Sequence, residues 1–128
     1  RLFSFSQEST RYCNYSDDRF GNEIAVVRPS FLLGDNSSGK FNRWSRAMVD
    51  CENNYFDLLK LGCSPQEARG VLPNDLKAEI MVTGNWREWR HCLKLRTAKD
   101  AHPDIRGVMR ALCDWLKTQV PVVFDDIS

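Results

Sequence analysis

The longest regular pattern of apolar residues along the chain predicts a helix over residues 41–62. Between Phe41 and Leu58 the apolar residues recur every three or four positions, so they form one face of a helix. Gly62 follows, and glycine commonly ends a helix because it adopts the left-handed conformation at little cost. A neighbouring element must cover this apolar face.

Capping and proline signals predict three further helices. A Ser-Pro-x-Glu pattern, which combines a capping box with proline at the first helical position, starts a short helix at Ser64 that Pro73 stops. A second capping pattern starts a helix at Asn85. The last helix starts at Pro103, shows apolar residues at helical spacing, and ends before Pro121.

Alternating or β-rich segments predict a small sheet. Residues 76–83 alternate between apolar and polar side chains, which is typical of a half-buried strand. Residues 23–28 predict a second strand, residues 2–5 predict a short extended segment, and the tail at residues 121–127 is a candidate edge strand. The pattern therefore predicts an α+β fold, in which one helix-rich domain over residues 1–128 carries a small antiparallel or mixed sheet.

Composition restricts the classes of function. The 128 residues carry a net charge of +1, so no global basic field favours nucleic acid or an anionic membrane. No apolar run approaches the roughly 18 residues that a membrane span needs. Five widely spaced cysteines without a C-x-x-C pair favour reduced thiols in a cytoplasmic protein over a disulfide framework or a zinc site. His91 and His102 lie on different predicted helices, so we expect no metal site.

Two short segments, the polar loop at residues 34–40 and the first four residues, carry further signals. Residues 34–40 (GDNSSGK) predict a flexible loop, the best candidate for disorder, and they lack the full pattern of a P-loop. The first four residues read neither as a signal peptide nor as a natural start, so we expect the chain to be an internal fragment.

Cationic residues beside two tryptophans make residues 85–106 the first candidate for chemistry. Arginines and lysines there are suited to an anion, and Trp86 and Trp89 are suited to a planar ring, although tryptophans on an amphipathic helix more often belong to a core. Arg96 has a structural alternative, since a cation stabilises a helix C-terminus. Ser9 has no histidine near it in sequence to activate it, so a hydrogen-bonding role is favoured over a nucleophilic one.

Three blocks of sequence, in order, resemble the flavin-dependent thymidylate synthases. Arg1 is followed by seven residues, Ser9 and an Arg-Tyr pair at residues 11–12, which is similar to the family's Arg-His-Arg, seven residues, Ser and Arg-Tyr. The second block is EARGVLP at residues 67–73. The third, over residues 85–106, is similar to the family's Asn-x-Arg, Leu-Arg and Ala-Gln-x-Glu-Ile-Arg. The resemblance implies that family's fold without its N-terminal part, or about its C-terminal two-thirds.

The resemblance also implies an activity and a set of ligand contacts. The reaction is the reductive methylation of dUMP to dTMP, a methyltransferase step of nucleotide biosynthesis, with methylenetetrahydrofolate as carbon donor and NADPH-reduced FAD as hydride carrier. The implied catalytic residue is Arg96, whose guanidinium favours the N3-ionised uracil. The implied dUMP contacts are Gln7, Ser9, Arg11, Arg69 and Arg96. The implied FAD contacts are Arg1, Gln7, Asn85, Arg87 and His91. Family members are homotetramers with sites between subunits, so we expect the same here.

Several positions depart from the family pattern. Ser6 and Gln7 stand where Asn-Glu is common, so an amide replaces a carboxylate near both ligands, and in an extended segment Glu8 would point elsewhere. Asp100 and His102 stand where other members have histidine and glutamine. Because the family's N-terminal part supplies further contacts, this chain alone is expected to form an incomplete site.

Two alternatives to the enzyme stay open at this point. The chain is either an inactive fragment or a non-catalytic module that binds nucleic-acid phosphate, and binding by such a module would fall steeply with salt. The arginines of that module would be Arg69, Arg87, Arg90 and Arg96.

Overall fold

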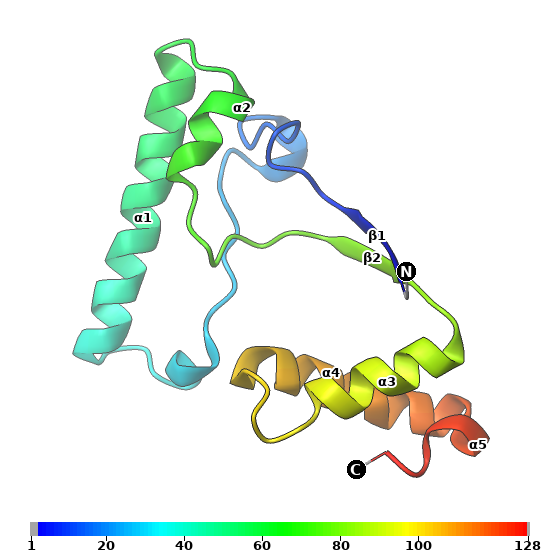
Figure 1. The fold of residues 1–128 in the computed structure, drawn as a ribbon. Helices are drawn as coiled ribbons and strands as arrows, with labels where there is room; N and C mark the ends of the chain where they lie inside the picture. Colours follow the sequence, from blue (N-terminus) through cyan, green and yellow to red (C-terminus); the bar gives the residue numbers. More distant parts are fainter. Residues whose placement is uncertain (1–2, 128) are drawn as a thin grey trace. The chain divides into compact units, whose positions relative to one another are not determined.

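The structure, a computed structural model drawn as a ribbon in Figure 1, describes residues 3–127. It divides into two units, and each has its own hydrophobic core. Unit 2 is Gln7–Ile80, and unit 1 joins the start of the chain, up to Ser6, to the segment from Met81 onward. The boundary passes through both strands of a two-stranded antiparallel sheet, β1 (Ser4–Gln7) and β2 (Ile80–Thr83). The predicted α+β class is confirmed.

The main element of unit 2 is α1 (Gly39–Lys60), which confirms the longest predicted helix. Ser38 caps it, since its hydroxyl accepts a hydrogen bond from the backbone N–H of Phe41 at 3.2 Å. Gly62 follows the helix with φ 93°, the left-handed conformation expected of a terminating glycine. In Figure 1, α2 (Pro65–Ala68) lies beside the C-terminal end of α1.

The capping box that starts α2 forms as predicted. The carboxylate of Glu67 accepts hydrogen bonds from the backbone N–H of Ser64 at 2.8 Å and from its hydroxyl at 2.7 Å. These bonds hold the pKa of Glu67 below its ordinary value. A short 3-10 helix, η3 (Arg69–Val71), continues directly from α2. The predicted short helix therefore reaches Arg69, one of the predicted dUMP contacts.

The core of unit 2 forms where α1 and α2 meet the N-terminal loops. Tyr55 of α1 is fully buried, and its ring meets that of Tyr15 edge-on, with centroids 5.7 Å apart. Two further 3-10 turns, η1 (Asp18–Phe20) and η2 (Ser30–Leu32), shape the intervening chain. The buried members of this core are Cys13, Tyr15, Ile24, Tyr55 and Ala68.

Two strand predictions were only partly right. The predicted strand at residues 23–28 is reduced to one antiparallel bridge between Val26 and Leu76. The segment at residues 76–83 forms a strand only from Ile80, and that strand is mostly exposed rather than half-buried. In both cases the backbone pairs over only a few residues, so the apolar alternation has no long partner strand to pack on.

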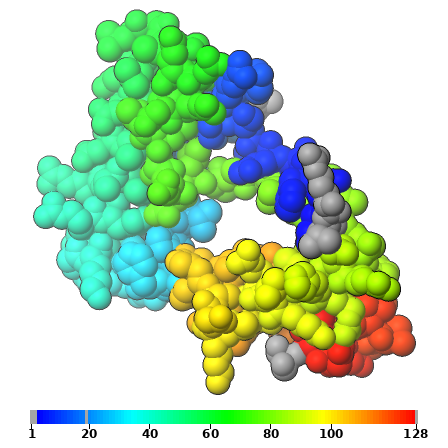
Figure 2. Space-filling view, viewed as in Figure 1, coloured from blue at the N-terminus to red at the C-terminus, as the bar shows by residue number. Residues whose placement is uncertain are grey.

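Unit 1 is built from three helices, α3 (Trp86–Arg96), α4 (Pro103–Gln119) and α5 (Pro121–Phe124), and the first two were predicted. The predicted edge strand at residues 121–127 is wrong, because Phe124 and Ile127, three residues apart, are both buried as on one face of a helical turn. Figure 2 shows these C-terminal residues (red) packed against α3 (yellow-green). The buried core of unit 1 is Leu93, Cys113, Leu116, Phe124 and Ile127.

The loop at residues 34–40 is ordered, so the prediction of disorder was wrong. The carboxylate of Asp35 accepts hydrogen bonds from the backbone N–H groups of Ser37 at 3.2 Å and Ser38 at 2.9 Å. Ser38 in turn caps α1, so the loop serves as a helix start. None of the five cysteines, all within residues 3–127, forms a disulfide, and every helix in that range is too short or too polar to serve as a membrane span.

Candidate functional site

An open groove of about 550 Å³ in unit 2 contains two of the predicted ligand contacts, Gln7 and Ser9. One wall is the segment that continues from β1, and the other is the segment that leads to β2. A backbone hydrogen bond from Glu8 to Glu79, 2.8 Å long, continues the pairing of the two walls beyond the strands. The lining residues are Gln7, Glu8, Ser9, Thr10, Pro73, Asn74, Leu76 and Ala78.

Ser9, which lines the groove, and Arg11, which follows it, share one tight turn. The carbonyl oxygen of Ser9 accepts hydrogen bonds from the N–H groups of Tyr12 and Cys13, both at 3.0 Å, and its hydroxyl lies 3.3 Å from the N–H of Arg11. These bonds fix where the Arg11 side chain leaves the backbone.

A side-chain hydrogen bond ties this turn to the helix that precedes Arg69. The guanidinium Nε of Arg11 donates to the side-chain oxygen of Gln66 in α2 at 2.5 Å. Arg69 lies three residues beyond Gln66, at the start of η3, with an exposed side chain. The fold therefore brings the elements that carry Ser9, Arg11 and Arg69 together.

The charges of Arg11 and Arg69 are not neutralised within the part of the chain that the structure describes. No carboxylate of residues 3–127 forms an ion pair with either guanidinium. Gln66 is a neutral partner, so its hydrogen bond orients Arg11 without cancelling its charge. Two such guanidiniums on elements that a hydrogen bond ties together are suited to a phosphate, which accepts paired hydrogen bonds from each.

The second group of predicted contacts lies on α3 in unit 1. Asn85 caps the helix as predicted, because its side-chain oxygen accepts a hydrogen bond from the N–H of Glu88 at 2.9 Å. Arg87 and His91, four residues apart, are exposed on nearly the same face of the helix. Arg96 is exposed at the other end of α3.

The phase of the helix separates Arg96 from Arg87. Nine residues at 3.6 per turn amount to a rotation of about 180° and a rise of about 14 Å. Within one copy of α3, these two side chains therefore leave from opposite faces.

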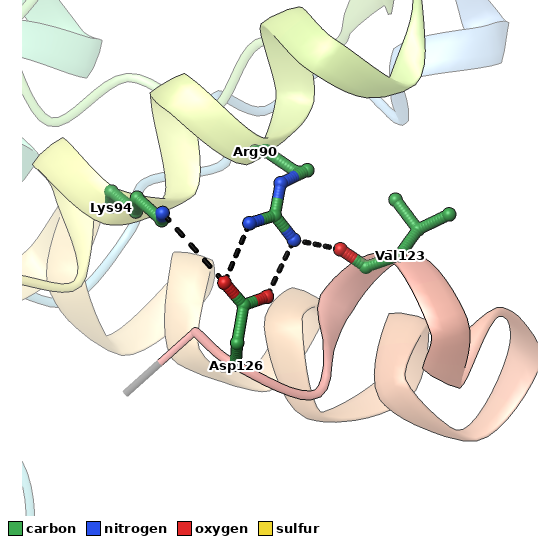
Figure 3. A network of polar contacts seen from close by, with 4 residues as sticks. All are labelled: Arg90, Lys94, Val123 and Asp126. Carbon is green, nitrogen blue, oxygen red and sulfur yellow. Dashed lines mark hydrogen bonds and ion pairs between the residues drawn. The ribbon is translucent and has the colours of Figure 1, made fainter.

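Arg90, which the nucleic-acid alternative included, has a structural partner instead. Its guanidinium forms a two-pronged ion pair with Asp126, with N–O distances of 2.6 and 2.7 Å, and donates to the carbonyl oxygen of Val123 (Figure 3). Lys94 lies 3.9 Å from the same carboxylate. The guanidinium lowers the pKa of Asp126 to about 2. Arg90 thus joins α3 to the chain after α5, and its charge is not available to phosphate.

The groove itself has an acidic edge. Lys77 forms an ion pair with Glu79 at 2.9 Å, and hydrogen bonding to Lys77 lowers the pKa of Glu79. Glu8, which lines the groove, forms no side-chain hydrogen bond or ion pair with any other residue of 3–127. Burial, and then the charge of Glu8, raise the pKa of the nearby Tyr15 hydroxyl to about 12.

The predicted dUMP contacts other than Arg96 all belong to unit 2. Gln7 and Ser9 line one groove, and the structure ties Arg11 to the helix before Arg69, all within unit 2. The contacts predicted on α3 belong to unit 1. Arg1 lies outside the described residues.

Two residues near these contacts were missed. Gln66 stands next to the EARGVLP block, but its pairing with Arg11, 55 residues away, has no local signal. Glu8 was expected to point away from Gln7, yet both line the groove because β1 ends at Gln7 and strict alternation ends with it. The alternation of side-chain directions along a strand therefore does not predict which residues line the groove once the strand has ended.

Two residues of α3 expose hydrogen-bond donors that suit a dinucleotide cofactor. Arg87 and His91 have no carboxylate partner among residues 3–127, so their donor groups are free for a diphosphate or for ring oxygens. Within the same residues, no group of three or more His, Cys, Asp or Glu side chains has the arrangement of a metal site.

Comparison with known proteins gives a family match over nearly the whole chain. The family model described as thymidylate synthase complementing protein matches residues 1–122. A flavin-dependent thymidylate synthase of Corynebacterium efficiens is 37% identical over 135 residues, which cover all of this chain and 54% of that protein. Proteins of the same name from Corynebacterium diphtheriae and Mycobacterium tuberculosis are 32% and 31% identical, again over 100% of this chain and 54% of their own length. The chain thus spans about half the length of the curated relatives it matches.

Proposed function

The chain belongs to the thymidylate synthase complementing protein family, and from that premise we propose that it forms part of a flavin-dependent thymidylate synthase. The proposed reaction converts dUMP to dTMP, with methylenetetrahydrofolate as carbon donor and NADPH as reductant. The observation that best supports it is the hydrogen bond between Arg11 and Gln66, which ties the Ser9 turn to the helix before Arg69. Two elements from distant parts of the sequence, each with an arginine that forms no ion pair within residues 3–127, are thereby tied together.

In this proposal Arg11 and Arg69 hold the phosphate of dUMP. Each guanidinium presents a planar fork of N–H groups that can donate two hydrogen bonds to phosphate oxygens. Ser9, whose hydroxyl already lies at the turn, orients the nucleotide beside Gln7. The bound phosphate fixes the distance of the uracil from the residues that act on it.

Arg96 acts on the uracil in this proposal. Its fixed positive charge stabilises the N3-ionised base, in which electron density rises at the ring carbon that accepts the new group. The hydride comes from FAD reduced by NADPH when the flavin is bound. Asn85, Arg87 and His91 are the residues of α3 that would hold this cofactor, and the latter two present free donor groups.

We further propose that sites are shared between copies in a homotetramer in the cytoplasm. Arg87 and Arg96 leave α3 on opposite faces, so a site that uses both kinds of contact draws on more than one copy. Exposed apolar side chains on α4 and α5, namely Val108, Trp115 and Val122, suit such assembly. Five cysteines without a disulfide among them suit a reducing compartment.

Turnover of the full protein tests the proposal. We expect dTMP to form from dUMP, methylenetetrahydrofolate and NADPH in the presence of FAD, and Arg96→Ala to lower kcat at least 100-fold, the scale of losing one donor to a developing charge. Lys94→Ala is the matched control, because it removes an exposed cation from the same helix and should keep kcat within about twofold. Absence of dTMP with the unaltered protein would refute the proposal, and full activity of Arg96→Ala would refute the role of Arg96.

A further inference from the structure

Glu8 is the one carboxylate among the residues that line the groove of unit 2. Its side chain is half-buried, and no hydrogen bond or ion pair engages it within residues 3–127. Lys77, on the opposite wall, feels the negative charge of Glu8, but its ammonium group donates its hydrogen bond to Glu79 at 2.9 Å. A carboxylate only accepts hydrogen bonds, so Glu8 offers its oxygens to a donor that comes from outside the chain.

The two ends of the groove differ in charge. At one end Gln7 and Glu8 continue from β1, and at the other end Thr10 leads into the Arg11 turn while Pro73 follows η3, which starts at Arg69. A phosphate is attracted to the cationic end and repelled from Glu8. A bound nucleotide monophosphate therefore lies with its phosphate near the arginines and its sugar or base toward Glu8.

The chemistry of dUMP then limits which of its groups can meet Glu8. Besides its phosphate, dUMP has two hydrogen-bond donors, the N3–H of the uracil and the 3′-hydroxyl of the sugar. Under the proposed function Arg96 stabilises the uracil with N3 ionised, so N3 is no longer a donor. The 3′-hydroxyl is the donor that is left, and acidic side chains commonly accept hydrogen bonds from sugar hydroxyls of nucleotides.

We propose that Glu8 is a specificity-determining residue of this groove and accepts a hydrogen bond from the 3′-hydroxyl of the bound nucleotide. Glu8 thereby selects nucleotides with a free 3′-hydroxyl and fixes the sugar between the phosphate and the uracil. The other polar side chains along the groove, such as Ser9 and Asn74, are neutral and supply hydrogen bonds without this selectivity. This inference rests on the proposed function, since it takes dUMP as the ligand.

Binding of two nucleotides to the full FAD-containing protein tests the inference. The probes are dUMP and 2′,3′-dideoxyuridine monophosphate, which lacks only the 3′-hydroxyl, and isothermal titration calorimetry gives both Kd values. A hydrogen bond to a charged acceptor predicts that the unaltered protein prefers dUMP by about 10- to 100-fold. Glu8→Ala should bring this ratio close to one, mainly by weakening dUMP. Glu8→Gln, which keeps the shape and a neutral acceptor, should give an intermediate ratio and provides a second variant should the alanine protein fail to fold.

Glu23→Ala is the matched control, because this glutamate also belongs to unit 2, is exposed, and does not line the groove. It should leave the ratio unchanged. The same preference for dUMP in Glu8→Ala or Glu8→Gln as in the unaltered protein overturns the inference, and so does an unaltered protein that binds both nucleotides equally. Binding of neither nucleotide by the unaltered protein overturns the proposed function, and this inference with it.

Discussion

The two buried tyrosines of unit 2 differ in whether their hydroxyls have a partner. Tyr55 is fully buried and its hydroxyl accepts a hydrogen bond from the backbone N–H of Tyr15 at 3.4 Å. Tyr15 is 4% exposed, yet its own hydroxyl has no hydrogen-bond partner among residues 3–127. Both rings pack edge-on against aromatic neighbours, so replacement of either by phenylalanine keeps the packing and changes only the hydroxyl.

The two substitutions are therefore expected to have opposite signs. Tyr15→Phe removes an unpaired buried hydroxyl, whose desolvation costs about 1–3 kcal/mol, so the free energy of unfolding should rise by roughly 1 kcal/mol. Tyr55→Phe removes a paired acceptor and leaves the N–H of Tyr15 unpaired, so the free energy of unfolding should fall by about 1 kcal/mol or more. The two variants should then differ by roughly 2 kcal/mol, although each loses one oxygen atom.

Urea unfolding at neutral pH measures this difference, provided that the m-value is the same in all three proteins. A Tyr15→Phe protein that is as destabilised as Tyr55→Phe would show that the Tyr15 hydroxyl makes a hydrogen bond in solution, and would refute the reasoning. A smaller gain than expected but of the right sign would support it.

The stability of the protein at alkaline pH gives a second, independent test of the burial of the Tyr15 hydroxyl. The pKa of Tyr15 is about 12 in the folded protein against an ordinary value of 10.0. Below pH 10 both states keep the proton, whereas between pH 10 and 12 only the unfolded state releases it, so stability falls as the pH rises through this range. Tyr15→Phe should lose less stability than the unaltered protein over the same range. Equal losses in the two proteins would contradict the raised pKa.

Two further substitutions test how unit 1 is held together. A Cβ on Gly84 would overlap the ring of Phe3, which packs edge-on against Trp89 with centroids 5.0 Å apart, so Gly84→Ala should lower the free energy of unfolding by about 1–3 kcal/mol. Thermal unfolding should show that this loss largely disappears in a Phe3→Ala background, and a loss that persists there would locate the strain elsewhere. Arg90 holds the pKa of Asp126 at about 2, below its ordinary 3.8, so the pair stabilises the fold above pH 4 and this contribution is lost as the pH falls toward 2. In urea unfolding, Asp126→Asn should be less stable than the unaltered protein at pH 7 and equally stable near pH 2, and a constant difference would exclude the ion pair as its cause.

The helices were predictable because their signals are local. The capping box of Ser64 and Glu67, and the cap at Asn85, lie within three residues of the helix start that they stabilise. Proline at the first helical position marked α2 and α4 in the same way. A reader of the sequence sees both partners of each such interaction at once.

The strands and the tail depend on partners that the sequence does not place. The pattern at residues 23–28 is typical of a strand, but it finds only one bridge, to Leu76, because the facing chain departs after a few residues. The tail at residues 121–127 is a candidate edge strand by its sequence, whereas burial of Phe124 and Ile127 against α3 and α4 favours a helical turn. Tertiary packing overrides β-propensity in short segments such as this one.

The candidate site shows the same division between local and distant information. The Ser9 turn follows from residues that are adjacent in sequence, and so does the cap at Asn85. The bond from Arg11 to Gln66, and the capture of Arg90 by Asp126, join residues 55 and 36 positions apart. Sequence spacing gives no sign of either, so Gln66 was missed and Arg90 was counted among the free cations of the nucleic-acid alternative.

One property of α3 does follow from spacing alone and limits how the proposed enzyme works. Once the segment is known to be a single helix from Trp86 to Arg96, a spacing of nine residues places Arg87 and Arg96 on opposite faces. A flavin held by Arg87 and a uracil held by Arg96 of the same copy would then lie on opposite sides of the helix, too far apart for a hydride to pass between them. Under the proposed function, the Arg87 that holds the flavin and the Arg96 that holds the uracil of one active site must therefore belong to different copies of α3. Mixed oligomers of Arg87→Ala and Arg96→Ala proteins should then recover part of the activity that each lacks alone, because some of their sites combine an intact Arg87 with an intact Arg96. Mixtures that stay as inactive as the separate variants, after exchange of subunits has been verified, would refute the sharing of sites between copies.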